Sequence, residues 1–117
     1  MAEIDLARLQ QETCARFGAE FDPVQNDLKV GISANVRGTD QHINGLRHPP
    51  EGDTTGWYIW AGNVLSDADD FFMPLHVAHL AEWCPQILKY LALPPGWRFL
   101  TAKDHEEVWF DASLLDI

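Results

Sequence analysis

Residues 70–99, DFFMPLHVAHLAEWCPQILKYLALPPGWRF, carry the longest helical pattern in the sequence. At about 100° per residue, one arc of this stretch is apolar and contains Val77, Leu80, Cys84, Ile87, Leu88 and Leu91. Pro74 suits a first helical turn, whereas Pro85 removes one internal hydrogen bond and clashes with the preceding turn. Because the apolar arc keeps its phase across Pro85, the pattern predicts one amphipathic helix, kinked at this proline and packed on a core.

Two strands are predicted after this central helix. Pro94-Pro95-Gly96 ends the helix, and residues 97–100 read as a strand that returns beneath it. The turn is expected to need a positive φ at Gly96, a conformation that side chains with a Cβ resist. Lys103-Asp104 then predicts a turn, and residues 107–110 are predicted to form a last short strand.

Before the central helix, the sequence predicts one further helix and two strands. Residues 2–17 have a thin apolar stripe, and Gly18 is placed to close a helix at its end. Apolar and small residues alternate over 28–36, as is typical of a strand. Residues 37–55 are expected to form a long loop or a short hairpin, because they are rich in turn-forming residues.

The stretch GWYIWAG, residues 56–62, is the most strongly β-prone part of the chain. Alternation places Trp57, Ile59 and Ala61 on one face of this strand. It places Tyr58 and Trp60 on the other face, so we expect both faces to be covered. One or two tryptophans, such as Trp60 or Trp109, are expected to stay exposed.

These elements predict the α+β class in a single domain that spans residues 1–117. The expected architecture is a mostly antiparallel sheet of about four strands. An N-terminal helix within residues 1–18 and the central kinked helix would pack on this sheet.

The chain is strongly acidic, with 18 Asp and Glu against 8 Lys and Arg and a formal net charge of −10. A nucleic-acid partner is not expected, because phosphate neutralisation requires a surplus of Lys and Arg. No apolar run reaches about 18 residues, so a membrane partner is not expected either. The acidic charge leaves open a basic protein partner, because complementary charge accelerates encounter, but an acidic surface can also serve solubility alone.

A cytoplasmic location is expected from two features. Cys14 and Cys84 are the two cysteines, one on each predicted helix, which suits a reducing compartment and small buried side chains. The start of the chain, MAEIDLARLQQ, has no cationic or apolar signal region, so no secretory signal is expected.

The metal-binding and catalytic motifs are incomplete. His76 and His79 form an H-x-x-H pair, but further zinc ligands would have to come from unlinked loops, so no metal and no cofactor is expected. Asp67, Asp69 and Asp70 fail as a calcium loop because Phe71 takes the next ligand position. No nucleophile motif or phosphate loop is present, so no catalytic residue and no enzymatic activity is predicted.

Four segments carry a resemblance to a known family: GWYIWAG at 56–62, FFMPLHVAHL at 71–80, CPQILKYLALPPGWRFL at 84–100 and EEVWFD at 106–111. In this order and spacing they resemble the Imm33-like immunity domain of bacterial polymorphic toxin systems. The most specific pieces are the G-W-Y-I-W strand and the L-P-P-G-W-R-F turn. The resemblance implies a small cytosolic protein that binds and neutralises a toxin, and it supplies no catalytic residues.

The leading interpretation is therefore an immunity protein that occludes the active site of a cognate toxin with an acidic, aromatic-containing surface. The toxin would be basic, as a nuclease is. The candidate partner-binding residues are Asp67, Asp69, Asp70, Glu106, Glu107, Trp60 and Trp109. Two alternatives stay open: a small metal-dependent or hydrolytic enzyme that uses histidines near the central helix, and a stand-alone ligand-binding or adaptor domain.

Overall fold

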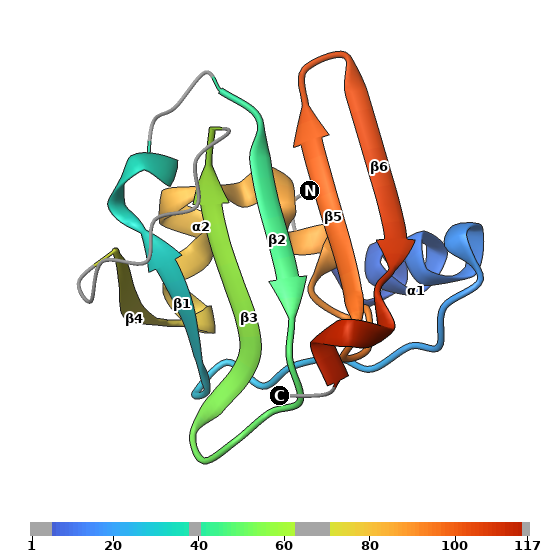
Figure 1. Cartoon of the computed structure of the whole chain (residues 1–117), viewed down its shortest axis with the longest axis horizontal. Coiled ribbons are helices and arrows are strands. Elements are labelled where there is room, and N and C mark those ends of the chain that lie inside the picture. Colours follow the sequence, from blue (N-terminus) through green and yellow to red (C-terminus); the bar gives the residue numbers. More distant parts are fainter. Residues whose placement is uncertain (1–5, 38–40, 63–70, 116–117) are drawn as a thin grey trace.

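A six-stranded mixed sheet forms the frame of the protein (Figure 1). The computed structural model describes residues 6–37, 41–62 and 71–115. The strands are β1 (Lys29–Ser33), β2 (Ile43–Arg47), β3 (Thr54–Ala61), β4 (Phe72–His76), β5 (Trp97–Ala102) and β6 (His105–Phe110). Their order across the sheet is β4-β1-β3-β2-β5-β6. The β1–β3 pair is parallel and the other four pairs are antiparallel.

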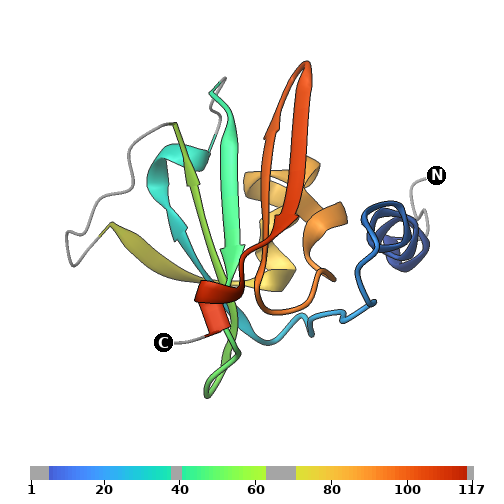
Figure 2. The same cartoon turned by 45° about the vertical axis from the view of Figure 1, so that its right-hand side comes forward.

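The N-terminal helix α1 (Leu6–Phe17), the short helix α2 (Leu80–Trp83) and the 3-10 helices η2 (Val77–His79) and η3 (Pro85–Tyr90) lie behind the sheet in the view of Figure 1. The 3-10 helix η1 (Ala34–Val36) follows β1 directly. The 3-10 helix η4 (Ala112–Leu115) lies on the front of the sheet, where Leu114 packs against Leu46 and Trp60. The view in Figure 2 shows α1 as a separate outer helix beyond the α2–η3 segment. Gln10 ties α1 to that segment, because its side-chain amide donates a 2.8 Å hydrogen bond to the carbonyl of Leu88.

The prediction of about four mostly antiparallel strands is wrong. The chain is α+β, but two strands were missed: β2 lies inside the predicted 37–55 loop, and β4 lies inside the predicted central helix. The centre of β2 is Asn44-Gly45, a pair that normally signals a turn. Gly45 is required there by packing, because a Cβ on this residue would lie 2.2 Å from the ring of Phe99.

The predicted kinked helix is also wrong, since residues 77–90 form η2, α2 and η3 rather than one helix. The helical path is broken at Cys84, whose φ of −163° is extended, directly before Pro85. The predicted apolar arc is nevertheless confirmed as core: Leu88 is partly buried against it, and the other members are buried, namely Val77, Leu80, Cys84, Ile87 and Leu91. Short helical turns keep residues three apart on one side, so the burial pattern survives without a continuous helix.

The main core lies between the sheet and the η2–α2–η3 segment. Tyr90 stacks on Phe99 with ring centroids 4.4 Å apart, and the ring centroid of Trp57 lies 5.6 Å from that of Phe99. The indole N–H of Trp57 donates a 3.1 Å hydrogen bond to the carbonyl of Leu91. The buried polar atom of the tryptophan is therefore satisfied, and the helical segment is fixed on one face of the sheet.

Within the described part of the chain, no helix has the length and apolar character needed to cross a membrane.

Candidate partner-binding surface

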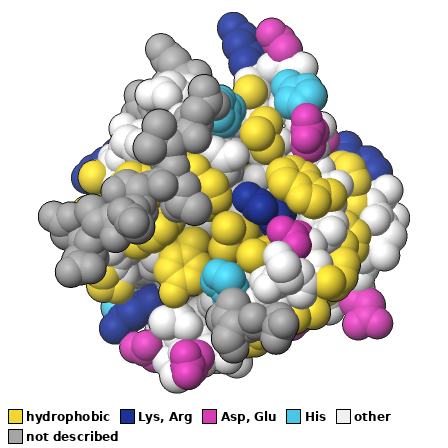
Figure 3. All heavy atoms as spheres, in the orientation of Figure 1, with side chains coloured by type: hydrophobic (Ala, Val, Ile, Leu, Met, Phe, Trp, Pro, Cys, Tyr) yellow, Lys and Arg dark blue, Asp and Glu magenta, His cyan; other side chains and the backbone are white. Residues whose placement is uncertain are grey.

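One face of the sheet carries no α2 or η3 segment and is turned toward the viewer in Figures 1 and 3. We call it the open face and define it by the side chains of Leu46, Tyr58, Trp60, Arg98, Glu107 and Trp109. Cross-strand partners form one row through all six strands: Pro74, Gly31, Tyr58, Leu46, Arg98 and Trp109. Since alternate side chains point to the same side, the neighbouring buried residues Trp57 and Ile59 face the core instead.

Aromatic rings cover the β3 and β4 end of the open face. The ring of Phe72 lies 5.2 Å from that of Tyr58 and 6.2 Å from that of Trp60, both in edge-to-face geometry. Leu114 of η4 packs with Leu46 and Trp60 in a small second core. Trp60 is therefore only 5% exposed, whereas Tyr58 keeps 36% of its surface accessible.

Arg98 and Trp109 form the β5 and β6 end of the open face. The Arg98 guanidinium lies 5.3 Å from the Trp109 ring centroid, which is cation–π distance. Its Nη1 lies 3.3 Å from a carboxylate oxygen of Asp111, while its buried Nε has no hydrogen-bond partner among the described residues. Hydrogen bonds from Ser113, and then from Arg98, hold the pKa of Asp111 below its ordinary value.

Glu106 and Glu107 are both predicted site residues, and their side chains lie on opposite faces of the sheet. Glu107 is exposed on the open face, and its carboxylate lies 2.6 Å from the imidazole Nε2 of His105. Glu106 points to the helical side, where it accepts hydrogen bonds from the Tyr90 hydroxyl and, at 2.8 Å, from Arg16 of α1. Glu106 thus links α1, η3 and β6.

The pKa of Glu106 reflects this network. Partial burial raises its pKa, but the Tyr90 hydrogen bond and the charges of Lys89 and Arg16 outweigh that effect and hold the pKa below its ordinary value. Burial, and then the contact with Glu106, raises the pKa of the Tyr90 phenol. Glu106 is therefore an ionised group of β6 that stabilises the fold through its contacts with α1 and η3.

The predicted site residues are only partly brought together. Glu107 and the half-buried Trp109 share the open face, with Trp60 buried on the same side. Asp67, Asp69 and Asp70 lie outside the described residues.

Arg98 and Tyr58 are open-face residues that the sequence reasoning missed. Both lie within the quoted motifs, PPGWRF and GWYIWAG, and both are residue types that dominate binding interfaces. The residue types could be read from the sequence, but the sequence did not show which side of each strand is exposed.

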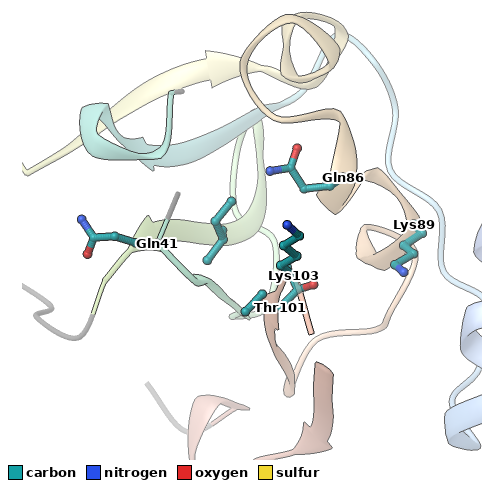
Figure 4. A pocket seen from close by; sticks show the side chains of 7 residues that line it. Gln41, Gln86, Lys89, Thr101 and Lys103 are labelled. Carbon is teal, nitrogen blue, oxygen red and sulfur yellow. The ribbon is translucent and has the colours of Figure 1, made fainter. Parts of the chain in front are cut away.

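A hollow with a volume of about 720 Å³ lies on the helical side of the sheet (Figure 4). Gln86 and Lys89 reach it from η3, and Thr101 and Lys103 reach it from the end of β5 and the following turn. The lining is rich in hydrogen-bond donors. Among the described residues that line it there is no carboxylate, thiol or histidine, the side chains used most often as acid–base groups and nucleophiles.

The described residues contain no group of three or more His, Cys, Asp and Glu side chains that could hold a metal ion. His76 and His79 lie near each other, with ring centroids 6.1 Å apart. A pair of histidines alone falls short of the three or four protein ligands of a zinc site.

Comparison with protein families gives a match over residues 9–111 to the model described as the Imm33-like domain. No curated protein and no solved structure matches the chain. The matched residues include the whole six-stranded sheet and thus the open face.

Proposed function

Because this chain belongs to the Imm33-like family, we propose that it is an immunity protein that binds and neutralises a cognate bacterial toxin. The family match, which covers residues 9–111, is the observation that carries this proposal. The proposal also assigns the toxin contact to the open face and the protein to the cytoplasm. Cys14 and Cys84 are free, buried thiols, which is compatible with a reducing compartment.

The composition of the open face supports its assignment as the binding surface. Tyr, Trp and Arg are the residues that most often carry the binding energy of protein interfaces. Tyr58, Arg98 and Trp109 lie in one cross-strand row, on a face that the α2–η3 segment leaves uncovered. Figure 3 shows hydrophobic side chains over much of this face, with basic and acidic groups among them.

The charge of the chain supports a basic toxin, such as a nuclease whose cleft is built to hold phosphates. A net charge of −10 accelerates encounter with a basic protein and disfavours acidic ones. In this proposal Glu107 lies at the contact, and Asp67, Asp69 and Asp70 contribute to the negative charge that attracts the toxin. Neutralisation then follows from occlusion of the active site, which requires no catalytic residue on the immunity protein.

The test uses, as the candidate toxin, the domain encoded by the gene next to that of this chain. Purified wild-type protein is expected to bind that domain, to block its activity in vitro and to protect cells that express it. Trp109→Ala is expected to weaken binding at least tenfold, mainly through faster dissociation. Phe21→Ala is the control, because Phe21 is an exposed aromatic residue that lies outside the sheet, in the segment between α1 and β1.

Two results would contradict the proposal. Absence of binding and protection would remove the immunity function, and equal effects of Trp109→Ala and Phe21→Ala would move the contact away from the open face. If protection instead required His76 or His79 in variants that still fold and bind, the enzyme alternative would replace occlusion.

A further inference from the structure

We infer that the free edge of β6 accepts an extended segment of the toxin as a seventh strand, and that this segment carries a basic side chain opposite Glu107. The inference rests on the proposed function and specifies how the toxin is held. It follows from the position of β6, the direction of its main-chain groups and the charges on its surface.

β6 ends the sheet and presents a regular edge. Its six residues pair in unbroken register with β5, from Trp97↔Phe110 to Ala102↔His105. Among the described residues, β6 has a sheet neighbour on this side only, because it is the last strand in the order. Figure 2 shows the turn end of the β5–β6 hairpin standing clear of the helices.

The opposite edge of the sheet is blocked in a way that β6 is not. Pro74 lies at the centre of β4 and has no N–H with which to pair a further strand. β6, HEEVWF, contains no proline, glycine or lysine, the residues that commonly protect sheet edges or interrupt strands. The two edges therefore differ, and β6 is the one suited to strand addition.

The main-chain direction along β6 follows from its hairpin. The two-residue loop Lys103-Asp104 makes Ala102 and His105 a hydrogen-bonded pair, and such pairs alternate along an antiparallel ladder. Consistent with this alternation, the N–H of Asp111 donates a 2.7 Å hydrogen bond to Gly96 beside β5. The N–H and C=O groups of Glu106, Val108 and Phe110 therefore point away from β5, toward the free edge.

Strand addition would extend the open face. A residue added opposite Trp109 would continue the row that runs through Leu46, Arg98 and Trp109. Main-chain hydrogen bonds supply affinity in this binding mode, and alternate side chains supply specificity. Both of the surfaces assigned to the toxin, the open face and the β6 edge, would then form one continuous interface.

Charge selects a toxin segment over a second copy of this chain. β6 carries Glu106 and Glu107, and like charges brought together across a strand pair are unfavourable. A second copy brings the same two glutamates and a further net charge of −10. A strand with Lys or Arg beside the exposed carboxylate of Glu107 is complementary, which matches the basic toxin of the proposed function.

Hydrogen exchange of the backbone amides tests the inference without changing the protein. In the free protein, the edge-facing amides of Glu106, Val108 and Phe110 should exchange faster than those of Glu107 and Trp109. In the complex with the neighbouring-gene toxin domain, the edge-facing amides should become at least tenfold more protected. Bound toxin that leaves the exchange of these three amides unchanged would overturn strand addition while the proposed function stands.

A proline substitution provides the second test. Val108→Pro removes an edge-facing N–H and leaves the β5–β6 ladder bonds in place, so the fold should tolerate it. Val108→Ala is the matched control, since it shortens the same side chain but keeps the N–H. We expect Val108→Pro to bind the toxin at least tenfold more weakly than Val108→Ala. Equal affinity of the two variants would overturn the inference. If Val108→Pro does not fold, the hydrogen-exchange experiment on the wild-type protein alone decides between the two outcomes.

The remaining outcomes separate this inference from its premise. A toxin domain that does not bind wild-type protein would overturn both proposals. A free protein that sedimentation shows to be a dimer, with edge amides protected only at high concentration, would assign β6 to a second copy and overturn the toxin strand.

Discussion

Glu106 and Glu107 are adjacent in the sequence, yet the carboxylate of Glu106 accepts a hydrogen bond from buried Tyr90 while that of Glu107 is exposed on the open face. Strand alternation separates them. We expect Glu106→Gln to lower the free energy of unfolding by about 1 kcal/mol at neutral pH, because it weakens the ion pairs with Arg16 and Lys89. Glu107→Gln should leave stability unchanged and slow toxin association.

The same pair gives a pH prediction. The folded-state pKa of Glu106 lies below the unfolded value of about 4.3, so its contribution to stability is present above that pH and is lost as pH falls through the folded pKa. Urea unfolding between about pH 2 and 6 should therefore show a shallower loss of stability in Glu106→Gln than in the wild type. If the stability of Glu107→Gln depended on pH as weakly as that of Glu106→Gln, the pH dependence would not be specific to Glu106.

Arg98 and Trp109 are expected to be energetically coupled, because the guanidinium lies 5.3 Å from the ring centroid. A double-mutant cycle with Arg98→Ala and Trp109→Ala should give a coupling of about 0.5–1 kcal/mol in the free energy of unfolding. Denaturant unfolding of the four proteins measures it. Strict additivity of the two substitutions would show that their proximity contributes nothing to stability.

Gly96 and Gly52 both have positive φ, but their surroundings differ. A Cβ on Gly96 would lie 2.5 Å from the Phe110 ring, whereas one on Gly52 meets nothing within 4 Å. Gly52→Ala should cost about 1 kcal/mol from backbone strain alone, and Gly96→Ala about 2–5 kcal/mol from strain and overpacking together. Equal shifts in melting temperature would contradict the tight turn at Gly96.

The acids before β4 are expected to act on association rates. The triple substitution of Asp67, Asp69 and Asp70 to Asn should slow binding of a basic toxin and flatten the salt dependence of the on-rate. Binding kinetics at low and at physiological ionic strength measure both effects, and melting curves check that the fold is intact. An on-rate and a salt slope equal to those of the wild type would exclude these three residues from electrostatic steering.

Much of the core could be predicted from the sequence. The strands over 56–62 and 97–100 and the last short strand are confirmed, as are the buried positions of the 77–91 arc and the positive φ of Gly96. These features depend on local causes, namely the alternation of apolar residues, the β-propensity of aromatic side chains and the conformational freedom of glycine.

The missed strands show where local signals fail. β2 contains Asn44-Gly45, which reads as a turn, but the strand is held by two neighbours, β3 and β5, and the ring of Phe99 occupies the space that a side chain at Gly45 would need. β4 has an apolar pattern that also fits a helix, and its pairing with β1 decides the outcome. Tertiary pairing overrides propensity in both cases.

The sequence by itself determined the family, the α+β class and the composition of the core, because each depends on residue identity and short-range order. Only the tertiary structure decided that Trp109 and Arg98 share an uncovered face, that Glu106 supports the fold, and that β6 ends the sheet. Alternation predicts that neighbouring side chains point to opposite faces. Which face the helices cover, and which strand lies at the edge of the sheet, depends on contacts between segments far apart in the chain.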